Sequence, residues 1–419
     1  MPLNITEKVG WTGGQYSLYR TTLGLYMLMY FLQLLPWGTE LFSNHGVLPE
    51  AETSPLAIPG VNILSFADSP TMVAAMLMIG VVASVALAVG KLDRVATIVL
   101  WYIWACLLGR NPLILNPGLP YVGWLLVAHA FLPPAPYGSW SARRRADPGH
   151  GWAMPGSIFF IAWFLMACGY SYAGYTKLIS PSWIDGSAIE KILDSPLVRP
   201  AMLREAVLNL PNPVLWLMSW SGLGFELAFA PLALFRRLRP WLWLAAVLMH
   251  LGLGLLLDFA NLTTGMLLMH FFTFNPIWLT STRANTVQTI FYDGHCGFCH
   301  RWIRFVIAED TDGSRFRFSP LQGNLIHKTL PTAYIESLLN SIIVMDTDGT
   351  PLTRSAAVMH ILWHLGGLWR VLCWSGRAIP QPLRDRIYDS VAACRHRLFL
   401  APEDTCPLLP PKLRQRFCD

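Results

Sequence analysis

Two cysteines separated by two residues offer the clearest chemistry in this sequence, Cys296 and Cys299. They follow a short apolar run that ends at Tyr292 and a turn that contains Gly294, and a helix-forming segment at 301–307 comes next. Backbone N–H groups and the positive end of a helix dipole stabilise a thiolate at the start of a helix. A second cysteine one turn later can close a disulfide and release a bound partner. The spacing therefore predicts a redox-active pair.

Three other interpretations of the pair stay open at this level. Zinc normally takes four ligands, but the sequence has no second pair of this spacing, and Cys394, Cys406 and Cys418 are widely separated. The string from Cys296 to His300 also matches the attachment motif of a c-type haem. That attachment is made outside the cytoplasm, whereas this pair is expected inside. An unreactive pair of thiols is the fourth possibility, and we expect no bound metal.

The segment after Arg283 supplies elements that could hold the cysteines. The expected elements are a strand at 287–292, a helix at 298–307, a strand at 315–320, a helix at 325–339, a strand at 341–346 and a helix at 355–365. Asp348 and Gly349 predict a hairpin turn after the third strand, and Ser355 is expected to cap the last helix. Strand–helix–strand followed by hairpin–helix predicts a small α/β thioredoxin-like domain over 284–419.

This segment resembles the DCC family of thiol-disulfide oxidoreductases, whose hallmark is Asp-x-x-Cys-x-x-Cys after a strand. Asp293, Cys296 and Cys299 occupy those positions, and His300 stands where the family often has Asn. The match continues through 318–322, 354–357, 379–385, Tyr388 and Arg395. The resemblance implies that Cys296 attacks a disulfide or an oxidised acceptor and that Cys299 resolves the intermediate. The expected partner is a thiol or disulfide substrate, either a protein or a small molecule. Asp293 would orient the turn or shuttle a proton.

The first 280 residues have the composition of a membrane protein. The chain of 419 residues is 53% hydrophobic and 13% charged, which is too apolar for a soluble protein of this size. Eight stretches are long enough, or nearly so, to cross about 30 Å of hydrocarbon. They lie near 17–36, 71–90, 95–109, 118–133, 155–176, 213–235, 240–257 and 262–280. We therefore expect a polytopic α-helical bundle of about eight spans over residues 1–283, with the lipid bilayer as its partner.

The distribution of charge indicates the orientation of this bundle. The net charge is +6, and its basic residues cluster at Lys91, Arg94, 143–145 and 236–239, on alternate connections. The 37–70 connection contains no Lys or Arg, so it is expected outside and both termini, with the cysteine domain, inside. The expected location is a bacterial cytoplasmic membrane, without a cleaved signal peptide. Nothing resembles a nucleic-acid recognition element, so no nucleic-acid partner is expected.

Ionisable residues inside the spans are candidates for function because burying them in lipid is costly. Lys177 ends the fifth span, Glu226 lies in the sixth, His250 in the seventh and His270 in the eighth. Lys177 could simply be an anchor that reaches the interface beside Trp183, and a membrane histidine is often a hydrogen-bonded packing residue. A lone carboxylate such as Glu226 needs a partner or a wet cavity.

These positions resemble the HTTM domain, a membrane module similar to the vitamin K-dependent γ-carboxylase. The matching residues are Tyr172, Ala173, Gly174, Lys177, Leu178, Trp183 and Gly186. The resemblance implies that Lys177 acts as a base on a quinol, and that Glu226, His250 and Trp183 contribute to a site for a lipid quinone. Such a base must be desolvated enough to be neutral. No other tightly bound cofactor is expected.

Three alternative functions are therefore predicted for the chain. The first is thiol-disulfide exchange at Cys296 and Cys299, with electrons passing to or from a lipid quinone in the membrane domain. The second is a carboxylase-like modifying enzyme that uses Lys177 as base and the cysteine domain to regenerate its cofactor. The third is a membrane anchor for a redox domain. Since Lys177 is expected near the outer face, a diffusing quinone would have to link the two sites.

Overall fold

The computed structural model describes residues 9–50, 54–56, 61–148, 151–258, 261–280, 287–331, 335, 341–346, 348–398 and 410–418. These residues form two compact units. The helical unit comprises Tyr19–Leu132 and Pro155–Phe274. The sheet unit comprises Val9–Leu18, Pro133–Met154 and the described part of Asn275–Asp419. Two segments from the N-terminal half of the chain thus belong to the unit that carries the cysteines.

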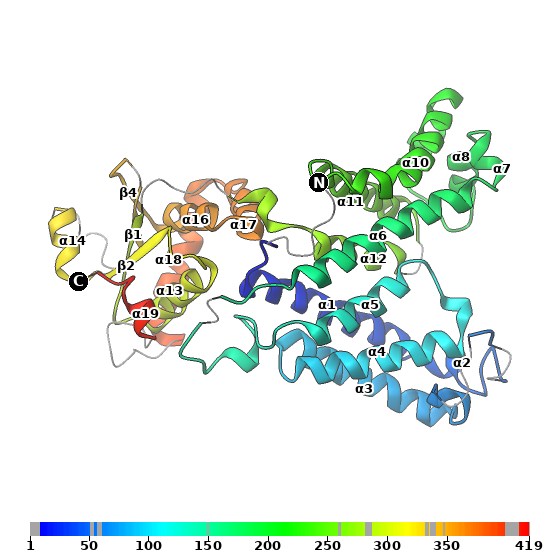
Figure 1. Ribbon diagram of the computed structural model, residues 1–419, viewed down its shortest axis with the longest axis horizontal. Coiled ribbons are helices and arrows are strands. Elements are labelled where there is room, and N and C mark those ends of the chain that lie inside the picture. The colour runs from blue at the N-terminus through cyan, green and yellow to red at the C-terminus, as the bar shows by residue number, and fades with distance from the viewer. Residues whose placement is uncertain are drawn as a thin grey trace. The chain divides into compact units, whose positions relative to one another are not determined.

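Long helices occupy all eight of the apolar stretches (Figure 1). They are α1 (Gly13–Leu34), α3 (Pro70–Val89), α4 (Asp93–Arg110), α5 (Leu119–Phe131), α6 (Gly156–Lys177), α10 (Asn212–Ala233), α11 (Arg239–Leu256) and α12 (Leu262–Thr273). Short helices in the connections are α2 (Gly38–Phe42), α7 (Pro181–Ile184), α8 (Ala188–Leu193) and α9 (Met202–Leu208). Within the described residues, α3, α6 and α11 are long and apolar enough to cross a membrane, and α5 and α12 are shorter apolar helices. A helical membrane-type region is confirmed, whereas the number of eight spans stays a prediction.

Local sequence signals explain why α3 begins and ends where it does. Ser69 precedes the helix in extended conformation, and its Oγ accepts a hydrogen bond from the backbone N–H of Met72 at 3.3 Å. Pro70 occupies the first turn, where its missing N–H costs nothing. Gly90 ends the helix with φ +72°, a left-handed conformation that favours glycine. The cap, the proline and the glycine are all readable in the sequence.

The sheet unit is built on a mixed four-stranded sheet with strand order β2-β1-β3-β4. The strands are β1 (Gln288–Tyr292), β2 (Phe316–Pro320), β3 (Ile343–Met345) and β4 (Pro351–Thr353). β1 pairs parallel with β2 and antiparallel with β3, and β4 pairs antiparallel with β3. The helices are α13 (Gly297–Glu309), α14 (Asn324–Thr329), α16 (Arg354–Leu365), α17 (Gly367–Arg377), α18 (Gln381–Leu398) and α19 (Pro411–Arg414). The expected strand–helix–strand followed by hairpin–helix is confirmed, although most of 330–339 lies outside the described residues.

Both faces of this sheet are buried. Ile290 packs with Ile303 and Ile361 in one apolar cluster, whereas its neighbour Phe291 packs with Ile326 in another. Successive side chains of a strand point to opposite faces, so β1 must be apolar at consecutive positions to fill both clusters. This explains the continuous apolar run that precedes the cysteines and fixes the strand that leads into them.

The predicted capping role of Ser355 is wrong. The residue before α16 is Thr353, which makes no side-chain capping bond, and Ser355 already lies in the first turn. The Ser355 hydroxyl instead donates to the Asp385 carboxylate on α18, and the Ser355 backbone N–H donates to the same oxygen at 3.3 Å. A carboxylate from a distant helix therefore caps α16, and a local pattern cannot reveal such a partner.

Candidate functional site

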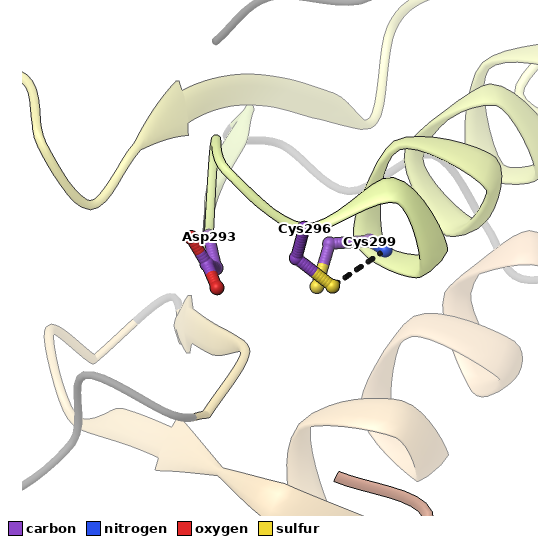
Figure 2. A group of neighbouring side chains, drawn as sticks. All are labelled: Asp293, Cys296 and Cys299. Carbon is purple, nitrogen blue, oxygen red and sulfur yellow. Dashed lines mark hydrogen bonds between the residues drawn. The ribbon is translucent and has the colours of Figure 1, made fainter. Parts of the chain in front are cut away.

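The cysteine pair lies at the start of α13, as the sequence predicts. Cys296 is the extended residue that caps the helix, and its Sγ accepts a hydrogen bond from the backbone N–H of Cys299 at 3.2 Å. Figure 2 shows the two sulfur atoms side by side at the first turn, with Asp293 on the preceding turn. The sulfur of Cys296 thus takes the place that a serine or aspartate oxygen occupies in an ordinary helix cap.

This position makes the two thiols chemically different. The hydrogen bond from the Cys299 side chain, helped by the Cys299 backbone N–H and the charge of Arg395, lowers the pKa of Cys296 to about 6. Burial and the Asp293 carboxylate oppose this shift. The same hydrogen bond, together with burial, raises the pKa of Cys299. These shifts favour the thiolate form at Cys296 and the protonated form at Cys299.

Cys299 is more accessible to solvent than Cys296. Cys296 is only 1% exposed, whereas Cys299 lines a cavity of about 190 Å³. Phe298, Trp302 and Val358 contribute apolar walls to this cavity. Of the two sulfur atoms, the one on Cys299 is therefore the more accessible from this cavity.

Asp293 holds the turn that leads into the helix. One carboxylate oxygen accepts from the His295 backbone N–H at 3.0 Å and from Gln322 Nε2 at 3.1 Å. The other oxygen pairs with Arg395 at 3.3 Å. Gln322 also accepts from the backbone N–H of Gly294 at 3.0 Å. Sequence reasoning left an orienting role and a proton-shuttling role open, and this geometry favours the orienting role.

Several residues around the pair were noticed in the sequence only as family matches. Arg395, which is 4% exposed, lies on α18 and places a positive charge beside both the carboxylate of Asp293 and the thiols. The Tyr388 hydroxyl accepts from the backbone N–H of Ile342 at 3.0 Å and fixes α18 to the end of the sheet. Both residues lie on α18, far from the cysteines in the sequence, and only their match to the family pattern could have drawn attention to them.

The geometry disfavours the haem and zinc alternatives. His300 is buried, and its Nε2 donates to the carbonyl of Gly294 at 2.9 Å, so the nitrogen that would reach haem iron is already used. Asp293, Cys296 and Cys299 offer three ligand atoms within 4.8 Å of one another, one fewer than a structural zinc site needs. The Asp293 carboxylate is also paired with Arg395, whose positive charge would oppose a cation.

The helical unit brings together three of the predicted membrane residues. Lys177 Nζ donates to the Glu226 carboxylate and lies 4.8 Å from the centre of the Trp183 ring. All three residues line a cavity of about 560 Å³, whose other walls are mainly apolar, including Phe225 and Met249. Glu226 therefore has the partner that a carboxylate in a membrane domain requires.

Gly174 explains how Lys177 and Glu226 meet. A Cβ at this position would lie 2.7 Å from the backbone nitrogen of Leu227 and 3.0 Å from the Cβ of Glu226. Only glycine therefore lets α6 approach α10 this closely, and Lys177 lies one turn farther along the same helix face. The glycine and lysine of the family motif serve one geometric purpose.

His250 belongs to a neighbouring network and is not among the residues that line this cavity. Its Nε2 lies 2.7 Å from the Tyr170 hydroxyl, which also lies 2.7 Å from Nε2 of His270. Tyr170 was not predicted as a site residue, because the candidates inside the spans were only lysine, glutamate and histidine. Its position, seven residues before Lys177 on α6, was the available signal.

The lowered pKa of Cys296 predicts an unusual pH profile for alkylation. The rate of Cys296 modification by iodoacetamide should rise through a pH of about 6 and level off by neutral pH, because only the thiolate reacts. In denaturant the same cysteine should follow an ordinary thiol, with an inflection near pH 8.5. Mass spectrometry of the labelled peptide measures both profiles. A native inflection near 8.5 would contradict the stabilised thiolate.

Comparisons with known protein families agree with both halves of this structure. Residues 15–278 match the HTTM domain, and residues 290–401 match the DCC1-like thiol-disulfide oxidoreductase family. The chain is 32% identical over 135 residues to "Uncharacterized protein YuxK" of Bacillus subtilis (strain 168). The aligned region is 31% of this chain and 93% of that protein. No solved structure matches. The chain therefore belongs to the HTTM family of membrane proteins and carries a DCC1-like thiol-disulfide oxidoreductase domain after its membrane domain.

Proposed function

We propose that this redox enzyme is a membrane-bound oxidoreductase of the protein-disulfide reductase type, with a thioredoxin-like catalytic domain over residues 284–419. The observation that carries the proposal is the difference between its two thiols. Cys296 caps α13 and accepts from the backbone N–H of Cys299, which lowers the pKa of Cys296, whereas burial and the same pair raise the pKa of Cys299. A nucleophile and a resolving thiol are thus one helical turn apart, which is the arrangement that disulfide exchange requires.

The exchange proceeds in two balanced steps. The Cys296 thiolate attacks one sulfur of a substrate disulfide, which breaks the substrate S–S bond and releases one substrate thiolate. Cys299 then passes its proton to the substrate thiolate that was released first and attacks the Cys296 sulfur, which breaks the mixed disulfide and releases the second substrate thiolate. Two electrons pass to the substrate, and the enzyme is left with a Cys296–Cys299 disulfide. The reverse sequence returns the pair to the dithiol when a thiol reductant supplies the electrons.

A lipid quinone is the proposed electron partner in the membrane domain. The cavity beside Lys177 and Glu226 is mainly apolar, with a charged pair and Trp183 on its wall. An apolar pocket with few polar groups suits a quinone ring and its isoprenoid tail. Oxidation of the Cys296–Cys299 dithiol to its disulfide would supply the two electrons and two protons that reduce a quinone to a quinol, and the Lys177–Glu226 pair would transfer a proton to the quinone.

The same cavity supports a second candidate function. Lys177 would act as the base of a carboxylase-like modifying enzyme, and the cysteine pair would regenerate its cofactor. The hydrogen bond from Lys177 to Glu226 gives the lysine a neighbour that can take its proton before it acts as a base. In a third possibility, the helical unit only anchors the redox domain.

The three chain segments that form the sheet unit support the proposed orientation. Val9–Leu18, Pro133–Met154 and Asn275–Asp419 belong to one compact unit. Four long helices separate the first segment from the second, and four more separate the second from the third. An even number of crossings between these segments keeps all three on one side of a membrane. Arg143, Arg144 and Arg145 lie in the second segment, so we propose that this side is the cytoplasm of a bacterial cell.

A redox titration of Cys296 and Cys299 in isolated membranes, with and without added quinone, tests the proposal. We expect a reversible two-electron couple between roughly −270 and −120 mV. We also expect quinone to accelerate oxidation of the pair. A pair that does not titrate would exclude disulfide exchange, and a couple that quinone leaves unaffected would exclude the proposed electron partner.

A further inference from the structure

The helix α17 carries an exposed apolar and basic surface for which the proposed chemistry has no use. Its inner residues, Trp369 and Cys373, are buried in the core of the sheet unit. On its outer side Val371, Leu372 and Trp374 are 37%, 47% and 48% exposed. We call these three residues, with the arginines at 370 and 377, the α17 surface.

The arginines of the α17 surface border its apolar part. The guanidinium groups of Arg370 and Arg377 lie 3.7 and 4.8 Å from the centre of the Trp363 ring. Trp363 in turn packs edge-on against Trp374. A row of tryptophan and aliphatic side chains bordered by arginines is typical of helices that lie in the interface of a membrane.

Contacts within the sheet unit place the start of α17 next to the ends of membrane helices. The Gln15 side chain, in the first turn of α1, accepts from the backbone N–H of Leu368 at 2.9 Å. Pro276, three residues after α12 ends, would lie 2.9 Å from a Cβ at Gly367. Gly366 and Gly367 have φ values of +75° and +56°, which permit this close approach.

A buried carboxylate strengthens the connection between α17 and α1. Glu309, at the end of α13, accepts from the backbone N–H of Gly14 at 2.8 Å and from Trp369 Nε1 at 2.6 Å. It therefore caps the N-terminus of α1 and holds α17 at the same time. Gln15 lies in the first turn of α1 and Pro276 follows α12, so α17 is held by the two segments through which the chain passes between the sheet unit and the helical unit.

We propose that the α17 surface docks on the headgroup region of the bilayer that holds the HTTM domain, and that anionic lipids are its partner. Val371, Leu372 and Trp374 enter the boundary between headgroups and acyl chains, and Arg370 and Arg377 contact lipid phosphates. This docking holds the redox domain against the membrane and does not depend on the direction of electron transfer at the cysteines.

Photo-crosslinking of the full chain in lipid nanodiscs tests this docking. The photoreactive amino acid p-benzoylphenylalanine replaces Leu372, or Lys328 on α14 as an exposed control, in discs of phosphatidylcholine and phosphatidylglycerol. We expect about tenfold more lipid adduct at 372, because the apolar face of an interfacial helix is buried among the lipids. Arg377→Gln should lower the adduct at 372 by about fivefold in these discs, and much less in pure phosphatidylcholine.

Each other result would overturn the proposal. Adducts at 372 only with the same chain or with a second copy would mean that protein covers the α17 surface. Equal lipid adducts at 372 and 328, or none at either, would mean that the surface has no preference for the bilayer. Both labelled positions are exposed, so the substitutions leave the core intact. A normal redox titration alongside a failed crosslink would reject the docking and leave the proposed function standing.

Discussion

Cys296→Ser should reduce thiol-disulfide exchange by at least about 1,000-fold, since it removes the nucleophile itself. A serine hydroxyl stays protonated at neutral pH even at the start of a helix. The variant therefore has no nucleophilic anion in place of the thiolate. Cys299→Ser should have a different effect. Cys296 would still attack a substrate disulfide, but no second thiol could break the resulting bond. The mixed disulfide should therefore accumulate and be visible by mass spectrometry under non-reducing conditions.

The matched control for these variants is Cys394→Ser, which removes an exposed cysteine on α18 and should leave exchange unchanged. The two active-site variants also show whether the attacking thiol is Cys296, whose pKa is lowered, or Cys299, which is more accessible. If Cys296→Ser forms the trapped adduct and Cys299→Ser does not, the more accessible Cys299 is the attacking thiol and the two roles are reversed. Full exchange activity in both single variants would reject the redox proposal.

Lys177→Ala should destabilise the helical unit by about 2 kcal/mol, because breaking a partly buried ion pair leaves the Glu226 carboxylate without this partner in a mainly apolar cavity. The double variant Lys177→Ala with Glu226→Gln removes both charges and should recover most of this loss. The loss of stability is measured as thermal unfolding of the purified protein in detergent. Lys191→Ala, which removes an exposed lysine of α8, is the control and should have little effect.

The double variant also separates the three functions of the chain, because it tests chemistry without an unpaired charge. If quinone is the electron partner, quinone-dependent oxidation of the cysteines should fall about tenfold, since a proton-transfer pair is lost. Exchange with a small disulfide should stay unchanged. Complete loss of activity on the natural substrate would favour Lys177 as the base of a modifying enzyme. If the double variant changes neither assay, the helical unit acts only as an anchor for the redox domain.

Sequence patterns were reliable where neighbours along the chain decide the structure. The apolar character and length of the eight stretches predicted the helices there, and the apolar run before Asp293 predicted β1. The spacing of Cys296 and Cys299 predicted a helix start with both thiols on its first turn. Ser355 shows where the same reasoning was wrong, because a carboxylate thirty residues away took over the capping role.

Pairings between distant residues needed the tertiary structure. Sequence alone marked Lys177 and Glu226 as costly charges, but the crossing of α6 and α10 at Gly174 makes them partners. Tyr170 likewise meets His250 and His270 only because three helices converge. A membrane interior offers no water to an ionisable group, so its partner is determined by which helices pack together.

The sequence by itself determined that this protein has a helical membrane domain and a cysteine pair at the start of a helix, because hydropathy and helix caps act over a few residues. Only the tertiary structure showed which side chains hold the turn before the cysteines, because Arg395 and Gln322 reach Asp293 from elsewhere in the chain. It also decided that residues 9–18 and 133–154 join the cysteine-containing unit. Buried charges and backbone groups must find partners, and folding brings those partners from parts of the chain that no local pattern connects.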